Sequence, residues 1–83
     1  MGYLIIFKSV THAQNIIFYL NKNAVMAHLV QPPLSLGTGS CSYGVKIRPG
    51  DFVKAKQLID KTSVQMVKVY QILPNEAYQE VRI

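Results

Sequence analysis

The chain has 83 residues, which is room for one domain, and 49% of them are hydrophobic against 16% charged. This composition suits a packed core and excludes an intrinsically disordered chain. Nine Lys and Arg residues against four Asp and Glu give a formal charge of +5, which would attract anionic partners, although the basic residues are scattered as on an ordinary solvated surface.

The cellular compartment is indicated by the first residues and by the cysteine count. The start of the chain lacks the basic leader and small-residue cleavage site of a signal peptide, and no apolar run reaches the length of a membrane span. The single cysteine, Cys41, cannot form an internal disulfide. We therefore expect a cytoplasmic protein with no membrane contact and with a reduced thiol.

The first third of the chain predicts a strand followed by a helix. Residues 3–7 form an unbroken apolar run, which is typical of a strand buried on both faces and therefore central in a sheet. Ser9 and Thr11 are both candidate N-caps of the helix, and Thr11 with Gln14 forms a capping-box pattern. The inner face of this helix shows helical spacing at Ala13, Ile16, Ile17 and Leu20.

The remaining sequence predicts three more strands and a second helix. Residues 25–30 alternate as a strand that Pro32 ends, and residues 42–47 alternate again. Pro49 suits the first turn of a helix, and residues 66–72 form the fourth strand. The inner stripe of this second helix comprises Phe52, Ala55, Leu58, Ile59 and Thr62.

The predicted order βαββαβ indicates an α+β fold of the ferredoxin-like type. We expect a four-stranded antiparallel sheet, with the strand order 4-1-3-2 and two helices on one face. The domain would span residues 1–72, and residues 73–83 would form a C-terminal tail that is either docked on the body or disordered. Met26, His28 and Val30 should lie on the face away from the helices, and the apolar first strand suggests that a second subunit or the tail covers this face.

A glycine-rich segment, residues 37–44, contains the only cysteine. Backbone amides around Gly39 and Ser40 can converge on an anion, either a phosphate or the thiolate of Cys41. A flexible hairpin connection accounts for the glycines equally well. The segment is not a P-loop, because it lacks the Gly-Lys-Ser/Thr ending and leads into a strand.

The predicted topology brings this segment to the end of the sheet where the first strand turns into the first helix. We therefore expect Cys41 to lie near Lys8, Thr11 and His12, with the first-helix amides favouring the thiolate and lowering the pKa of the Cys41 thiol. Lys46 and Arg48 would be too far along the strand to act as counter-charges. An unreactive structural thiol is the alternative interpretation.

Other chemistries find little support in the sequence. It has no carboxylate pair or Ser-His-Asp set, so we expect no enzyme activity. His12, His28 and Cys41 lack the paired spacing of a zinc site, and we expect neither a metal nor a cofactor. Residues 42–47 weakly resemble the third strand of RNA-recognition motifs, but the alternation turns Tyr43 toward the helices, which argues against nucleic acid. A non-enzymatic ligand- or RNA-binding module remains the alternative.

Residues 3–72 resemble the selenium/sulfur carrier protein-like family, a small bacterial domain. The resemblance rests on the opening YLIIFKS, a proline-containing connection, a single cysteine before the third strand, Pro49 before the second helix, and VYQI at residues 69–72. The chain has Ser42 and Arg48 where family members often have glycine and an acidic residue. The resemblance implies that Cys41 accepts sulfur or selenium, as a persulfide or perselenide, from a donor enzyme and passes it to an acceptor protein.

Overall fold

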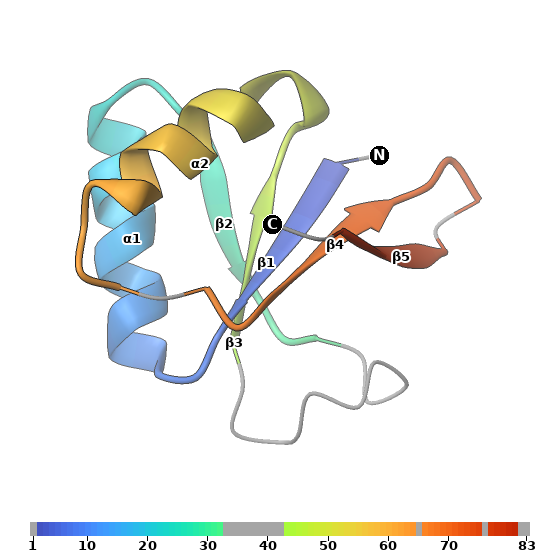
Figure 1. The fold of residues 1–83 in the computed structure, drawn as a ribbon, viewed down its shortest axis with the longest axis horizontal. Helices are drawn as coiled ribbons and strands as arrows, with labels where there is room; N and C mark the ends of the chain where they lie inside the picture. The colour runs from blue at the N-terminus through green and yellow to red at the C-terminus, as the bar shows by residue number, and fades with distance from the viewer. Residues whose placement is uncertain (1, 33–42, 65, 76, 82–83) are drawn as a thin grey trace.

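The computed structural model describes residues 2–32, 43–64, 66–75 and 77–81 (Figure 1). The elements from β1 to β4 follow the predicted order βαββαβ, and one further strand comes after them. In chain order they are β1 (Gly2–Phe7), α1 (Val10–Lys22), β2 (Ala27–Val30), β3 (Tyr43–Ile47), the 3₁₀ helix η2 (Pro49–Asp51), α2 (Phe52–Asp60), β4 (Lys68–Ile72) and β5 (Tyr78–Val81).

The strands form one five-stranded sheet in the order β2-β3-β1-β4-β5, and every neighbouring pair is antiparallel. The predicted order 4-1-3-2 and the central place of β1 are confirmed. The prediction of four strands is wrong, because β5 pairs with β4 in a register that aligns Val69 with Val81. The Leu73 amide donates to the Ala77 carbonyl at 2.8 Å, which closes the turn between the two strands.

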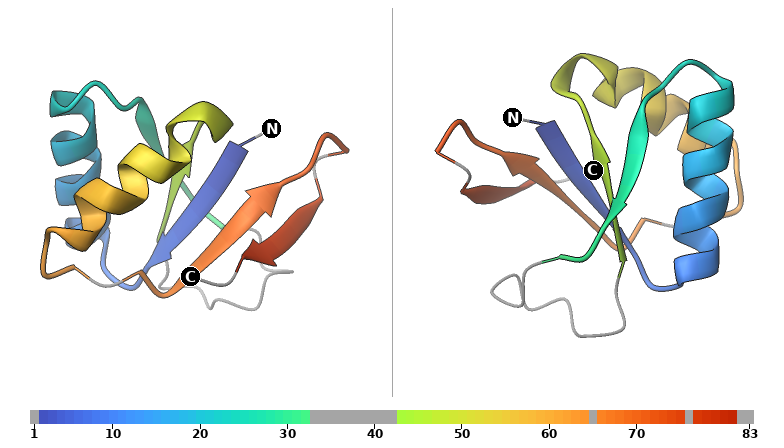
Figure 2. Two further views of the ribbon diagram at one scale, coloured as in Figure 1. Left: turned by 45° about the horizontal axis from the view of Figure 1, so that its top comes forward. Right: turned by 180° about the vertical axis from the view of Figure 1, so that it is seen from behind.

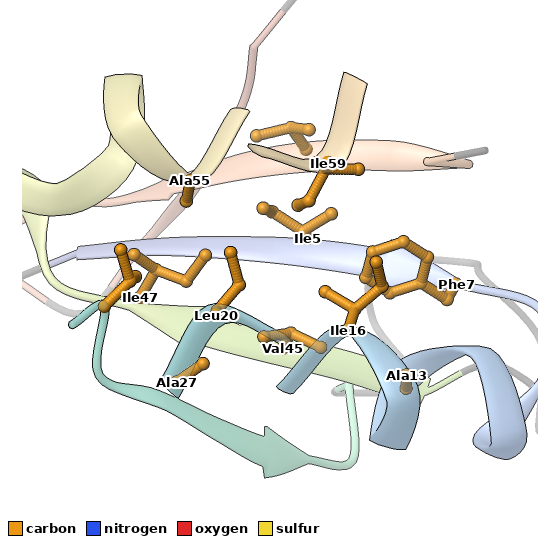
Figure 3. Packing of buried hydrophobic residues seen from close by; sticks show 12 residues of the cluster. Ile5, Phe7, Ala13, Ile16, Leu20, Ala27, Val45, Ile47, Ala55 and Ile59 are labelled. Carbon is orange, nitrogen blue, oxygen red and sulfur yellow. The ribbon is translucent and has the colours of Figure 1, made fainter. Parts of the chain in front are cut away.

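Both helices cover one face of the sheet (Figures 1 and 2). Between sheet and helices lies the larger core, in which side chains of β1 meet side chains of α1 and α2 (Figure 3). This helix-side core comprises Ile5, Phe7, Ala13, Ile16, Leu20, Val25, Ala27, Val45, Ile47, Ala55, Ile59 and Val69. Ile17, Phe52 and Leu58 are partly buried against it, as their spacing predicted.

The second face of the sheet carries a smaller core around Leu4 and Ile6, against which Val30 packs. The register pairs His28 with Lys46 and Val30 with Gly44, so the two β2 residues share this face as predicted. The buried members of this second-face core are Leu4, Ile6, Tyr70 and Ile72, each at most 9% exposed in the single chain. A dimer is therefore not needed to keep these side chains from water.

The helix ends and strand starts differ from the prediction by a few residues. Ser9 is the N-cap of α1, because its Oγ accepts hydrogen bonds from the amides of Thr11 at 3.2 Å and His12 at 3.4 Å. β2 starts at Ala27 rather than at residue 25, after a turn in which Ala24 has a φ of 65°. The second helix opens with the 3₁₀ turn η2, where Arg48 pairs with Asp51 at 3.2 Å.

Candidate functional site

The end of the sheet where β1 stops is the predicted location of the site. Phe7, the last residue of β1, is aligned with Tyr43, the first residue of β3. Cys41, Gly39 and Ser40 lie outside the described residues. The other predicted site residues, Lys8, Thr11 and His12, are all described and follow β1 directly.

Lys8 and His12 line an open hollow of about 440 Å³. Its other described lining residues are Ser63, Met66 and Val67, from the connection between α2 and β4. This connection reaches the end of β1 because the Val67 amide donates to the Ile6 carbonyl at 2.8 Å. The structure thus brings together two predicted site residues.

Sequence reasoning did not single out Ser63, Met66 or Val67. The predicted strand order could have shown that the connection between α2 and β4 lies at this end of the sheet. In an antiparallel pair, β4 must begin beside the end of β1, so the residues just before β4 have to lie close to Lys8. The side chains that face the hollow could not be chosen in this way, because the connection has no regular period.

The hollow has a basic character. Two of its described lining residues, Lys8 and His12, can carry positive charge, and none of those residues is acidic. Across the described parts of the chain the ion pairs are Arg48–Asp51, Lys56–Asp60 and Lys68–Glu80, so none of them engages Lys8. The ammonium group of Lys8 can therefore bind an anionic group brought by another molecule.

The first turn of α1 uses its amides within the chain. The amides of Thr11 and His12 donate to the Ser9 Oγ, and the Ala13 amide donates to the Ser9 carbonyl at 3.0 Å. Thr11 is exposed and is not among the described residues that line the hollow. Attraction for an anion at this end therefore comes from side chains, from Lys8 and His12, more than from open helix amides.

The remaining candidates lie elsewhere. His28, Lys46 and Arg48 border a smaller hollow of about 120 Å³ around the far end of β3 from Tyr43. Within the described ranges, no three His, Cys, Asp or Glu residues are grouped so as to hold a metal ion. Tyr43 packs against the helix-side core, as its alternation predicted, and so does not offer its ring on the second face.

No helix in the described parts of the chain is long and apolar enough to cross a membrane. A family model with the description "Putative Se/S carrier protein-like" matches residues 2–71. The match runs from the start of β1 almost to the end of β4 and includes Cys41, Lys8 and His12. No curated protein and no solved structure shows significant similarity to the chain.

Proposed function

Because the chain belongs to the Se/S carrier protein-like family, we propose that it carries sulfur or selenium on Cys41 and relays it from a donor enzyme to an acceptor protein. The observation that carries the proposal is the family match across the segment that contains the only cysteine of the chain. A persulfide or perselenide needs a thiolate to hold it, and Cys41 supplies the single thiol. In this role the protein is a carrier and not an enzyme.

The transfer is an exchange between sulfur atoms that needs no oxidant. The Cys41 thiolate attacks the outer sulfur of a persulfide on the donor, the bond between the two donor sulfurs breaks, and the donor leaves as a thiolate. Cys41 then holds the outer sulfur as its own persulfide, and an acceptor thiolate removes it in the same way. A perselenide transfers its selenium by the same steps. With no second cysteine in the chain, no internal thiol can discharge the cargo.

The fold supports this role for Cys41 through chain connectivity. Cys41 precedes Tyr43 by two residues, and two peptide units span at most about 7 Å between Cα atoms. Tyr43 is aligned with Phe7, and Lys8 follows Phe7 at the same end of the sheet. A nearby ammonium group favours the thiolate over the thiol. We infer that the scaffold is a ferredoxin-like arrangement extended by β5, and that it works in the reducing cytoplasm, where a lone thiol persists.

The test is to load the purified protein with sulfur from a cysteine desulfurase and cysteine, and to measure its intact mass. We expect an increase of one sulfur atom, lost on addition of a reductant. Cys41→Ser should abolish the increase while the far-ultraviolet circular dichroism stays unchanged, and Lys8→Ala should slow the loading. Lys54→Ala, which removes another exposed charge, from α2, is the matched control. Loading of the Cys41→Ser protein, or a native Cys41 that does not react with alkylating reagents, would contradict the proposal.

A further inference from the structure

The hollow beside β1 combines two kinds of wall. Lys8, His12 and Ser63 offer an ammonium group, an imidazole and a hydroxyl group, while Met66 and Val67 offer apolar surface. Val67 leaves 42% of its surface exposed although it is apolar, and Met66 packs in part against the helix-side core. The apolar wall is therefore anchored to the fold and is still open to a ligand.

These walls favour one class of ligand. With the ammonium group of Lys8 and no acidic side chain among its described residues, the hollow attracts anions and repels cations. An inorganic oxyanion would use only the polar wall, whereas an organic anion can also cover the thioether of Met66 and the methyl groups of Val67. The volume of about 440 Å³ falls within the range of roughly 300–1,000 Å³ that is usual for small-molecule sites.

We infer that the hollow lined by Lys8, His12, Ser63, Met66 and Val67 binds a small organic carboxylate. Resting on the proposed function, the sulfur passes from the donor enzyme to Cys41 by way of the persulfide of a low-molecular-weight thiol that carries a carboxylate. The carboxylate pairs with Lys8 and His12, and the carbon chain lies against Met66 and Val67. Transfer follows the exchange given above: the outer sulfur moves to the Cys41 thiolate, and the small thiol leaves as a thiolate.

The binding step can be tested apart from the transfer by using a ligand that cannot give up sulfur. S-methylglutathione carries carboxylates, and its methylated sulfur cannot be transferred. Titrated into the ¹⁵N-labelled protein, it should shift the amide signals of Lys8, His12, Ser63 and Val67 in a saturable way. Lys8→Ala should weaken this binding by up to about fivefold, the upper end of the effect of an exposed charge pair. Lys54→Ala should leave it unchanged.

Two further measurements distinguish this inference from binding of an inorganic anion and from the proposed function. Val67→Thr keeps the shape of the side chain and replaces a methyl group by a hydroxyl, so it should weaken S-methylglutathione binding but not the binding of sulfate. Cys41→Ser should bind S-methylglutathione as the native protein does. The binding measurement therefore tests this inference separately from the sulfur loading that tests the proposed function. An affinity for S-methylglutathione that Lys8→Ala leaves unchanged, shifts spread away from the hollow, or sulfate bound as tightly as S-methylglutathione would overturn the inference.

Discussion

Gly44→Ala should destabilise the protein through a single misplaced methyl group. Gly44 lies in β3 between Ile6 and Val30, on the second face of the sheet. A Cβ atom at this position would lie 2.6 Å from Cδ1 and 3.3 Å from Cγ of Leu4, and 3.3 Å from the carbonyl oxygen of Val30. Carbon atoms normally approach to about 3.5–4.0 Å, so either Leu4 or β3 must shift.

The size of the effect follows from the burial of Leu4. The side chain of Leu4 is 1% exposed and belongs to the second-face core, so it cannot turn toward solvent without leaving its contacts. Adding a methyl group to such a site costs about 1–3 kcal/mol. In a domain of this size a loss of about 2 kcal/mol lowers the melting temperature by roughly 8–16 °C. The measurement is urea unfolding followed by circular dichroism, with the m-value compared between variants.

The chain offers a matched control in Gly50, which lies in η2. Apart from Gly50 and its two chain neighbours, no heavy atom of the described residues lies within 4 Å of a Cβ built at Gly50, so Gly50→Ala should change the free energy of unfolding by about 0.5 kcal/mol or less. Leu4→Ala alone should cost about 2–5 kcal/mol, and combined with Gly44→Ala the total should fall short of the sum, because the methyl group then enters the space that Leu4 has left. Equal effects of Gly44→Ala and Gly50→Ala, or full additivity with Leu4→Ala, would refute the packing argument.

Two other predictions concern the start of α1 and the last strand. Ser9→Ala should lower the free energy of unfolding by about 1 kcal/mol in the same urea assay, since the Thr11 and His12 amides lose their acceptor, while Ser9→Asp should retain most of the stability. Truncation after Ile72 should lower the urea midpoint, because it removes the pairing of β5 with β4 and the edge-to-face contact of Tyr70 with Tyr78, whose ring centroids lie 6.5 Å apart. A midpoint equal to that of the full chain would show that residues 73–83 are a dispensable tail.

The central strand and the strand order could be predicted because β1 departs from simple alternation. Ile5 and Phe7 enter the helix-side core, and Leu4 and Ile6 enter the second-face core, so the strand has no solvated face. An edge strand could not satisfy this pattern, because one of its faces or its free edge would meet water. With β1 central and all neighbouring strands antiparallel, two orders remain, and the tendency of consecutive strands to pair, here the second and third, selects 4-1-3-2.

β5 could not be predicted in the same way. Tyr78, Gln79 and Glu80 are exposed and Val81 is only partly buried, so the strand carries no clear apolar alternation. Its position depends on pairing with β4, which is a tertiary contact. The α1 cap was ambiguous for a local reason: Ser9 and Thr11 carry the same hydroxyl chemistry, and only the backbone of Ser9, with φ −119° and ψ 134°, has the extended conformation of a cap.

The location of the site in the fold could be predicted from the sequence, but most of the residues that line it could not. Topology alone leads to Lys8 and His12 at one end of the sheet, and both line the hollow there. The contribution of Ser63, Met66 and Val67 depends on the path of an irregular connection, which no period in the sequence records. The expectation that a second subunit or the tail covers the second face rested on its apolar residues, and four of these, Leu4, Ile6, Tyr70 and Ile72, are at most 9% exposed in the single chain.

The residues that line the hollow and the residues that form the two cores are largely different, and this makes the functional tests interpretable. Lys8 and His12 are exposed and stand outside both hydrophobic cores, so replacing them removes charge without opening a cavity. Exposed substitutions of this kind usually change stability by less than about 0.5 kcal/mol. Slower sulfur loading in Lys8→Ala with an unchanged urea midpoint would therefore report on chemistry at the site, whereas slower loading with a lower midpoint would report on folding.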